Sequence, residues 1–153
     1  MAKRSAGLLI YRSRSGALEV LLVHPGGPFF KNKDLGAWSI PKGEIEDAED
    51  ALAAACREVR EEIGIAAVGP FLELGSVTQR GGKIVIAYAC AGDHAVEAIE
   101  SNHFELEWPP RSGRRVSFPE VDRAAYFALS EARAKINPAQ SALLDRLELE
   151  LSR

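Results

Sequence analysis

The chain has 153 residues, with 19 Lys and Arg against 22 Asp and Glu, and a formal net charge of −3. This length suits one domain with a sizeable core, so we expect residues 1–153 to form a single domain. The slightly acidic balance argues against a nucleic-acid-binding protein, and no segment approaches the roughly 20 apolar residues of a membrane span.

The two cysteines, Cys56 and Cys90, lie outside any CxxC or Cys/His metal spacing. We therefore expect no disulfide and a reducing, cytoplasmic location. The first apolar run is too short for a signal peptide and is followed at once by Arg12 and Arg14.

The first third of the chain predicts strands. Residues 6–11 and 18–24 are apolar runs separated by a Ser- and Gly-containing turn, which is typical of a hairpin. A loop rich in Gly and Pro follows. Residues 38–40 predict a short strand, which Pro41 ends.

A helix is predicted from Asp47, a favourable capping residue, to about Ile63, where Gly64 stops it. Apolar residues recur along one face of this helix at a period of about 3.6. They are Leu52, Ala55, Val59 and Ile63, with Ala51 and Cys56 at the edges.

The second half predicts a hairpin, an irregular segment, a strand and two helices. Residues 71–79 and 83–91 form the hairpin, around a Gly pair. Residues 92–120 are expected to be irregular, because they contain two adjacent prolines. Residues 124–129 predict the last strand.

Two helices are expected at the C-terminal end. Ser130 is expected to cap a short helix that ends near Lys135, and Asn137 with Pro138 to begin the final helix. That helix should bury Leu143, Leu144, Leu147 and Leu151. Strands and helices in this order predict a mixed α/β domain with helices packed on a sheet.

The predicted central helix carries an unusual cluster of acids. Glu58 and Glu62 are four residues apart at one border of the apolar face, and Glu61 joins them on the outer side. Like charges at this spacing repel. The spacing alone favours a solvated face, in which Arg57 pairs with Glu61 but only poorly with Glu58. The alternative is a site for Mg²⁺ or Mn²⁺, which prefer carboxylate oxygens.

The surrounding stretch, GEIEDAEDALAAACREVREEIGI from Gly43 to Ile65, decides between these interpretations. It resembles the Nudix box, G-x5-E-x7-R-E-U-x-E-E-x-G-U with U aliphatic, and matches it at each fixed position. The order of predicted elements is also similar to a Nudix domain. The segment WPPRSG, which begins at Trp108, resembles one found in a branch of bacterial predicted Nudix NTP pyrophosphohydrolases.

The resemblance implies an α/β/α sandwich around a mixed sheet, with the box, residues 43–65, as loop–helix–loop. It implies Mg²⁺- or Mn²⁺-dependent hydrolysis of a nucleoside diphosphate linked to another moiety. It also implies metal ligands and catalytic groups at Gly43, through its carbonyl, and at Glu58, Glu61 and Glu62. Arg57 is expected to orient a glutamate and Glu49 to form a structural salt bridge.

Family members differ in the general base, so acids outside the box also stay candidates: Glu105, Glu107 and Glu120. Glu107, or else Glu105, is expected as an additional metal ligand, with an ordinary exposed acid as the alternative.

Substrate contacts are expected from five residues: Lys42, Arg80, Lys83, Trp108 and Arg111. An indole stacks well on a base, and guanidinium groups bind phosphate. The alternatives are an exposed lysine, an ordinary hairpin tip, and an indole packed under its loop.

Among small-molecule nucleotides, NTPs, including oxidised ones, rank slightly ahead of dinucleoside polyphosphates and nucleotide sugars. The sequence leaves open a homodimer, and a Nudix-fold module that senses a nucleotide without turnover.

Overall fold

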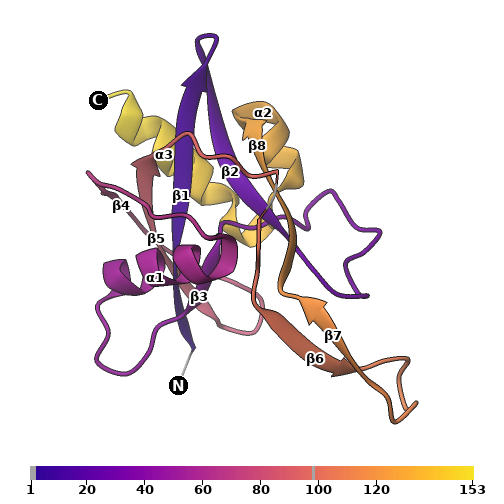
Figure 1. Ribbon diagram of the computed structural model, residues 1–153. Coiled ribbons are helices and arrows are strands. Elements are labelled where there is room, and N and C mark those ends of the chain that lie inside the picture. Colours follow the sequence, from indigo (N-terminus) through magenta and orange to yellow (C-terminus); the bar gives the residue numbers. More distant parts are fainter. Residues whose placement is uncertain (1–2, 98) are drawn as a thin grey trace.

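The structure is a computed structural model that describes residues 3–97 and 99–153. Its centre is a twisted sheet with the strand order β4–β5–β1–β2–β8, and β3 pairs with β1 (Figure 1). The strands of this sheet are β1 (Arg4–Arg14), β2 (Ala17–Pro25), β3 (Lys42–Glu44), β4 (Leu72–Thr78), β5 (Ile84–Ala91) and β8 (Val121–Ala128). Among the described strands, only β1 and β5 pair in parallel, so the sheet is mixed, as the resemblance to a Nudix domain implies.

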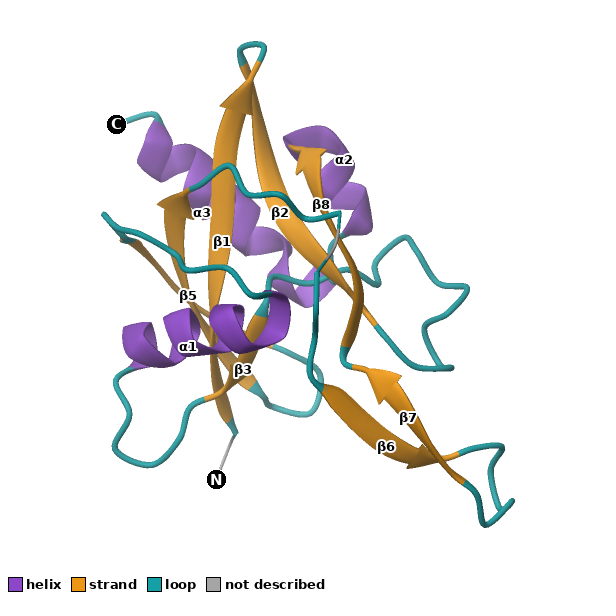
Figure 2. Ribbon diagram, viewed as in Figure 1, coloured by secondary structure: helices purple, strands orange, loops and turns teal. Residues whose placement is uncertain are grey.

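Helices cover both faces of the sheet (Figure 2). They are α1 (Ala51–Ile63), α2 (Leu129–Lys135), the 3₁₀ turn η1 (Pro138–Gln140) and α3 (Ser141–Leu151). Alternate residues of β1 enter opposite layers: Leu8 and Ile10 pack in the core under α1, and Leu9 packs in the core under α2 and α3. Strands buried on both faces explain the continuous apolar runs in the sequence.

Helix α1 begins three residues later than the sequence predicts. Ala48 has a φ of 62°, which breaks any helical run from Asp47. Asp50 is the actual cap, and its carboxylate accepts a hydrogen bond from Ala53 N at 3.1 Å. The predicted end is confirmed, because Gly64 adopts a left-handed φ of 71° and its N–H donates to Arg60 O.

The buried face of α1 is rotated relative to the predicted apolar stripe. Ala55, Val59 and Ile63 are buried as expected, but Leu52 is only half-buried. Ala54 and Glu62 are buried instead. This rotation turns one of the clustered acids towards the sheet.

The expectation of an irregular segment at residues 92–120 is wrong for residues 103–119. β6 (His103–Glu107) and β7 (Arg115–Pro119) form a separate antiparallel hairpin that projects from the body. Both prolines fall in its turn, where they remove no ladder hydrogen bond. Opposed pairs such as Phe104 with Phe118 give the hairpin one apolar face.

The C-terminal elements follow the predictions with smaller differences. β8 begins three residues early, α2 begins at Leu129 without a side-chain cap from Ser130, and Leu151 is 39% exposed rather than buried. Asn137 does cap the turn that leads into α3, by accepting from Ala139 N at 2.9 Å. The predicted strand at residues 38–40 is reduced to isolated bridges.

In the part of the chain that the structure describes, no helix is both long and apolar enough to cross a bilayer. Both cysteines are described and are free thiols, Cys90 buried and Cys56 half-buried.

Candidate active site

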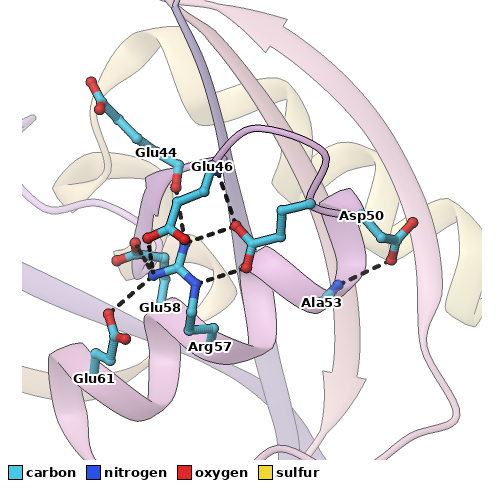
Figure 3. A network of polar contacts seen from close by, with 8 residues as sticks. Glu44, Glu46, Asp50, Ala53, Arg57, Glu58 and Glu61 are labelled. Carbon is cyan, nitrogen blue, oxygen red and sulfur yellow. Dashed lines mark hydrogen bonds and ion pairs between the residues drawn. The ribbon is translucent and has the colours of Figure 1, made fainter.

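Arg57 on α1 is the centre of a polar network (Figure 3). Its Nε and Nη2 donate to the two carboxylate oxygens of Glu49 at 2.7 and 2.9 Å, and Nη2 also donates to Glu44 O at 3.1 Å. Hydrogen bonding to Arg57 lowers the pKa of Glu49 to about 2. The predicted salt bridge of Glu49 is confirmed, although Glu49 lies before the helix and not on it.

The third guanidinium nitrogen of Arg57 contacts two of the clustered acids. Nη1 donates to Glu58 Oε1 at 2.9 Å and to Glu61 Oε2 at 3.1 Å. The expected pair with Glu61 is confirmed, but the expectation that Glu58 pairs poorly with Arg57 is wrong. A guanidinium carries five N–H donors on a long side chain, so it reaches a sequence neighbour that a shorter cation would miss. The Arg57 guanidinium therefore hydrogen-bonds three carboxylates and has a fourth, Glu46, at 3.9 Å, which leaves a surplus of acid.

Gly43 on β3 lies directly against Glu58. β3 pairs with β1 so that Gly43 faces Ala6 across the ladder. A Cβ atom at Gly43 would lie 2.0 Å from the Glu58 carboxyl carbon. The absence of a side chain at this position is what allows the carboxylate to rest beside the β3 backbone. Burial raises the pKa of Glu58, and its contact with Arg57 opposes that effect.

Glu62 points into a hollow of about 220 Å³ between α1 and the strand ends. Its side chain is only 6% exposed, and burial raises its pKa, with hydrogen bonding to Glu120 as the second cause. Glu120 reaches the hollow from the exposed corner between β7 and β8. The hollow is lined by Val23, Pro25, Ser39, Ile40, Pro41, Lys42, Glu62, Glu120 and Val121.

Lys42 brings positive charge to this hollow. It precedes Gly43 on β3, and burial lowers its pKa, as does the nearby charge of Lys83, while Glu62 and Glu58 act in the opposite direction. The structure thus brings Lys42 to the hollow beside Glu62, with Lys83 close enough to affect the pKa of Lys42. Arg80 lies instead beside Gln79 and Asn137 in a separate depression.

The remaining predicted site residues lie on the projecting hairpin. Glu107 accepts a hydrogen bond from Arg111 N at 3.0 Å, which shapes the turn, and Trp108 packs edge-on against Phe29. Arg115, the strand partner of Glu107, precedes Glu120 by five residues of extended chain, or roughly 17 Å. The structure therefore does not bring Glu107, Trp108 or Arg111 to the clustered glutamates.

Glu120 is the acid that sequence reasoning did not single out. It was one of three candidates outside the box, and only the pairing of the hairpin decides among them. β7 runs back to the body and ends at Pro119, so Glu120 is delivered to the hollow. The signal in the sequence is the alternation of Phe104, Leu106, Val116 and Phe118 on either side of the prolines.

The donors in this region suit a hard divalent cation. Glu58, Glu61, Glu62 and the carbonyl of Gly43 are all oxygen donors, and carboxylates crowded against a bare backbone lack sufficient positive charge nearby. Among the described residues, no three Asp, Glu, His or Cys side chains already converge on one point, and Arg57 contacts both Glu58 and Glu61. The chemistry of the residues fits the metal, and their present rotamers are those of an arginine-bridged cluster.

Comparison with known proteins agrees with this geometry. The family model described as NUDIX domain matches residues 1–147. The chain belongs to the Nudix hydrolase family. The asymmetrical bis(5′-nucleosyl)-tetraphosphatase of Sus scrofa is 37% identical over 122 residues, which cover 71% of this chain and 79% of that protein.

Further similarities of this Nudix domain include a shorter match and a likeness of fold. The protein of the same name from Caenorhabditis elegans is 38% identical over 65 residues, and the match covers 42% of this chain and 43% of that protein, so less than half of the relative is spanned. A crystal structure of a C. elegans Ap4A hydrolase binary complex has a TM-score of 0.67 at 21% identity and covers 97% of this chain and 98% of that chain. The Nudix-type fold implied by the sequence is confirmed.

Proposed function

We propose that this Nudix domain hydrolyses a pyrophosphate linkage in a nucleoside diphosphate linked to another moiety. One observation carries the proposal: the buried Glu62 of α1 and the corner residue Glu120 line one hollow together with Lys42, and Glu58 lies four residues before Glu62 on the same helix. Such a cluster is costly to hold in a fold unless it has a ligand that supplies positive charge.

The ligand is a divalent cation, Mg²⁺ or Mn²⁺, held by the carboxylates of Glu58, Glu61 and Glu62 and the carbonyl of Gly43. When bound, such an ion neutralises phosphate charge and lowers the pKa of a coordinated water. Arg57 orients Glu58 and Glu61, because its guanidinium contacts both carboxylates. It does not line the hollow, so we assign it no contact with substrate.

Two residues act at the hollow itself. Lys42 lies at its wall and places a cationic group where a substrate phosphate would approach the acids. Glu120 enters from outside the helix and has no contact with Arg57, so its carboxylate serves to take the proton of the attacking water.

For the substrate we infer a dinucleoside polyphosphate. The sequence ranks NTPs slightly higher, but the matched Sus scrofa and C. elegans relatives are named as bis(5′-nucleosyl)-tetraphosphatases. The Sus scrofa match covers most of both chains, which is the support for preferring this class.

A nucleotide panel tests the proposal. Purified protein is incubated with NTPs, dinucleoside polyphosphates, nucleotide sugars and ADP-ribose, with and without Mg²⁺ or Mn²⁺, and the nucleotide and phosphate products are separated. We expect metal-dependent release of product, which Glu58→Gln or Glu62→Gln abolishes and which Glu73→Gln, on the exposed side of β4, preserves. Nucleotide binding without turnover across the panel would favour a sensing module instead.

We also propose that the protein acts in the cytoplasm on a small-molecule nucleotide. The two free cysteines, one of them buried, support a reducing compartment. Cell fractionation tests the location, and sedimentation of the purified chain tests the homodimer that the sequence leaves open.

A further inference from the structure

Two segments extend side by side from the corner at Glu120. The first arm is the loop of residues 26–36, and the second arm is the hairpin of residues 103–119. Gly26 N donates to Glu120 O at 2.9 Å, Gly27 lies against the ring of Phe104, and Phe29 contacts Trp108. These contacts follow the hairpin outward, so residues 26–29 of the first arm run along the hairpin from the corner at Glu120 to its turn.

The first arm is fixed to the body at several points. The buried His24 lies with Nε2 2.6 Å from Lys33 O and with Nδ1 2.8 Å from Asp122 Oδ1. Asp34 accepts from Trp38 Nε1 at 2.8 Å and also contacts Lys135. A loop held in this way presents its side chains at fixed positions, which lowers the entropy lost on binding a ligand.

The arms carry positive charge on an acidic protein. They contain five Lys and Arg residues against three Asp and Glu residues, whereas the whole chain has an excess of acid. Each of the three acids is engaged: Asp34 with Lys135, Glu105 with Arg115, and Glu107 with the backbone of Arg111. In the described part of the chain, the side chains of Lys31, Arg111 and Arg114 form no ion pair.

The same two arms carry an exposed aromatic surface. Phe29 is 59% exposed, and its ring meets the half-buried Trp108 edge-on, with ring centroids 5.5 Å apart. An edge-to-face pair leaves one ring face open to a planar ligand. Aromatic faces stack nucleobases without regard to sequence, and guanidinium groups bind phosphates, so the surface has the chemistry of a nucleotide site.

The position of this surface decides which part of a ligand it meets. Trp108 N donates to Arg114 O, and Arg114 precedes Glu120 by six residues, or roughly 20 Å of extended chain. A ligand whose scissile phosphates lie at the hollow reaches Phe29 only with its far end. We propose that Phe29, Trp108, Arg111 and Arg114 bind the second nucleoside and adjoining phosphates of a dinucleoside polyphosphate, which rests on the proposed function.

Comparison of a long with a short substrate tests this proposal. The values of kcat/KM for diadenosine tetraphosphate and for ATP are measured in the wild type, Phe29→Ala, Phe29→Tyr and Arg114→Ala. We expect the ratio of long to short substrate to fall about tenfold in Phe29→Ala and Arg114→Ala, through the KM of the long substrate. Phe29→Tyr keeps a stacking face and should keep the ratio. Val68→Ala and Arg153→Ala are the matched controls on other exposed surfaces.

Either of two kinetic results in Phe29→Ala and Arg114→Ala would overturn the proposal: an unchanged ratio of kcat/KM values, or an equal loss of kcat/KM on both substrates. A change in the sedimentation mass of these variants would also overturn it, because the arms would then be an interface between copies. Failure of the proposed function gives a different result, namely no turnover of either nucleotide. In that event, calorimetric binding of the same two nucleotides tests the second nucleoside site. Weaker binding of diadenosine tetraphosphate alone in Phe29→Ala supports the second site, and equal affinities refute it.

Discussion

Arg57 binds Glu49 through two parallel hydrogen bonds, from Nε to Oε2 at 2.7 Å and from Nη2 to Oε1 at 2.9 Å. Glu49 lies in the turn before α1, and Arg57 lies two turns inside the helix. The pair therefore ties the loop after β3 to the helix that carries the clustered acids. Bidentate pairs of this kind fix orientation as well as distance, so the direction of the Arg57 side chain towards Glu58 is set by Glu49.

This pair predicts an acid-dependent loss of stability. The contact with Arg57 holds the pKa of Glu49 at about 2, below its ordinary value of 4.5. A carboxyl with a lowered folded-state pKa contributes stability that is present above the unfolded pKa and lost as pH falls through the folded pKa. We expect the free energy of unfolding, measured by urea titration, to fall between about pH 4.5 and pH 2. The fall should be steeper in the wild type than in Glu49→Gln. Glu46→Gln, whose carboxylate is 3.9 Å from Arg57 and exposed, is the control. Parallel pH profiles for the wild type and Glu49→Gln would show that the pair contributes nothing.

Substitution of the three acids outside the box, Glu105, Glu107 and Glu120, should show that only Glu120 is needed for activity. Glu120 lines the hollow with Glu62, whereas Glu105 pairs with Arg115 and Glu107 shapes the hairpin turn. We expect Glu120→Gln to lower kcat by roughly 10²- to 10⁴-fold, the range for loss of a general base. Glu105→Gln and Glu107→Gln should stay within about twofold of wild type on ATP, where the arms are not engaged. A large loss in Glu107→Gln with normal Glu120→Gln would reverse the assignment.

Gly43→Ala should damage the site while sparing the fold. Gly43 does not have a positive φ, so its backbone accepts alanine, but the new Cβ would lie 2.0 Å from the Glu58 carboxyl carbon. The carboxylate end of Glu58 must move away, because it is more flexible than the strand. We expect metal affinity or activity to fall about 10- to 100-fold, with thermal unfolding nearly unchanged. Glu44→Ala on the same strand has an exposed side chain and is the control. Normal activity in Gly43→Ala would mean that Glu58 acts from another position.

Local signals in the sequence identify the box and the strands, but not every boundary or register. The box can be identified because its acids, arginine and glycines occur at fixed spacings within one segment. The start of α1 cannot be identified in this way, because Asp47 and Asp50 are equally good caps. In addition, the left-handed φ of Ala48 is a conformation that alanine seldom adopts. The burial of Glu62 also breaks the apolar pattern of the helix, as functional residues often do.

Contacts between residues far apart in the chain could not be predicted from the sequence. The projecting hairpin has alternating apolar residues, but its two prolines mask the pattern until their place in the turn is known. The position of Glu120 depends on where that hairpin returns to the sheet. The contact of Phe29 with Trp108 joins residues far apart in the chain, and spacing along the sequence carries no information on it.

Helix α3 should account for a large part of the stability on its side of the sheet. Leu143, Leu144 and Leu147 are completely buried there, whereas Leu149 on the same helix is 60% exposed. Leu144→Ala leaves a cavity in the core, and we expect it to lower the free energy of unfolding by about 2–5 kcal/mol. Leu149→Ala should change it by less than about 0.5 kcal/mol. Denaturant titration of both variants measures the difference, and similar values would mean that α3 is not docked as described.

Metal binding should raise the melting temperature through the same acids that repel one another without it. On the proposal that Glu58, Glu61 and Glu62 hold a divalent cation only in the folded protein, the ion should stabilise the fold by mass action. At a hundred times its Kd, the gain of about 2.7 kcal/mol corresponds to roughly 5–10 °C for a domain of this size. We expect Mg²⁺ or Mn²⁺ to produce this shift in the wild type, and chelation to reverse it.

In Glu58→Gln and Glu62→Gln the shift should shrink, because each variant loses one of the proposed carboxylate ligands. The arginine-bridged rotamers of Glu58 and Glu61 must then rearrange as the ion binds, so Arg57→Ala should change the size of the shift without removing it. An equal shift in all variants, or one reproduced by NaCl at matched ionic strength, would place the metal elsewhere.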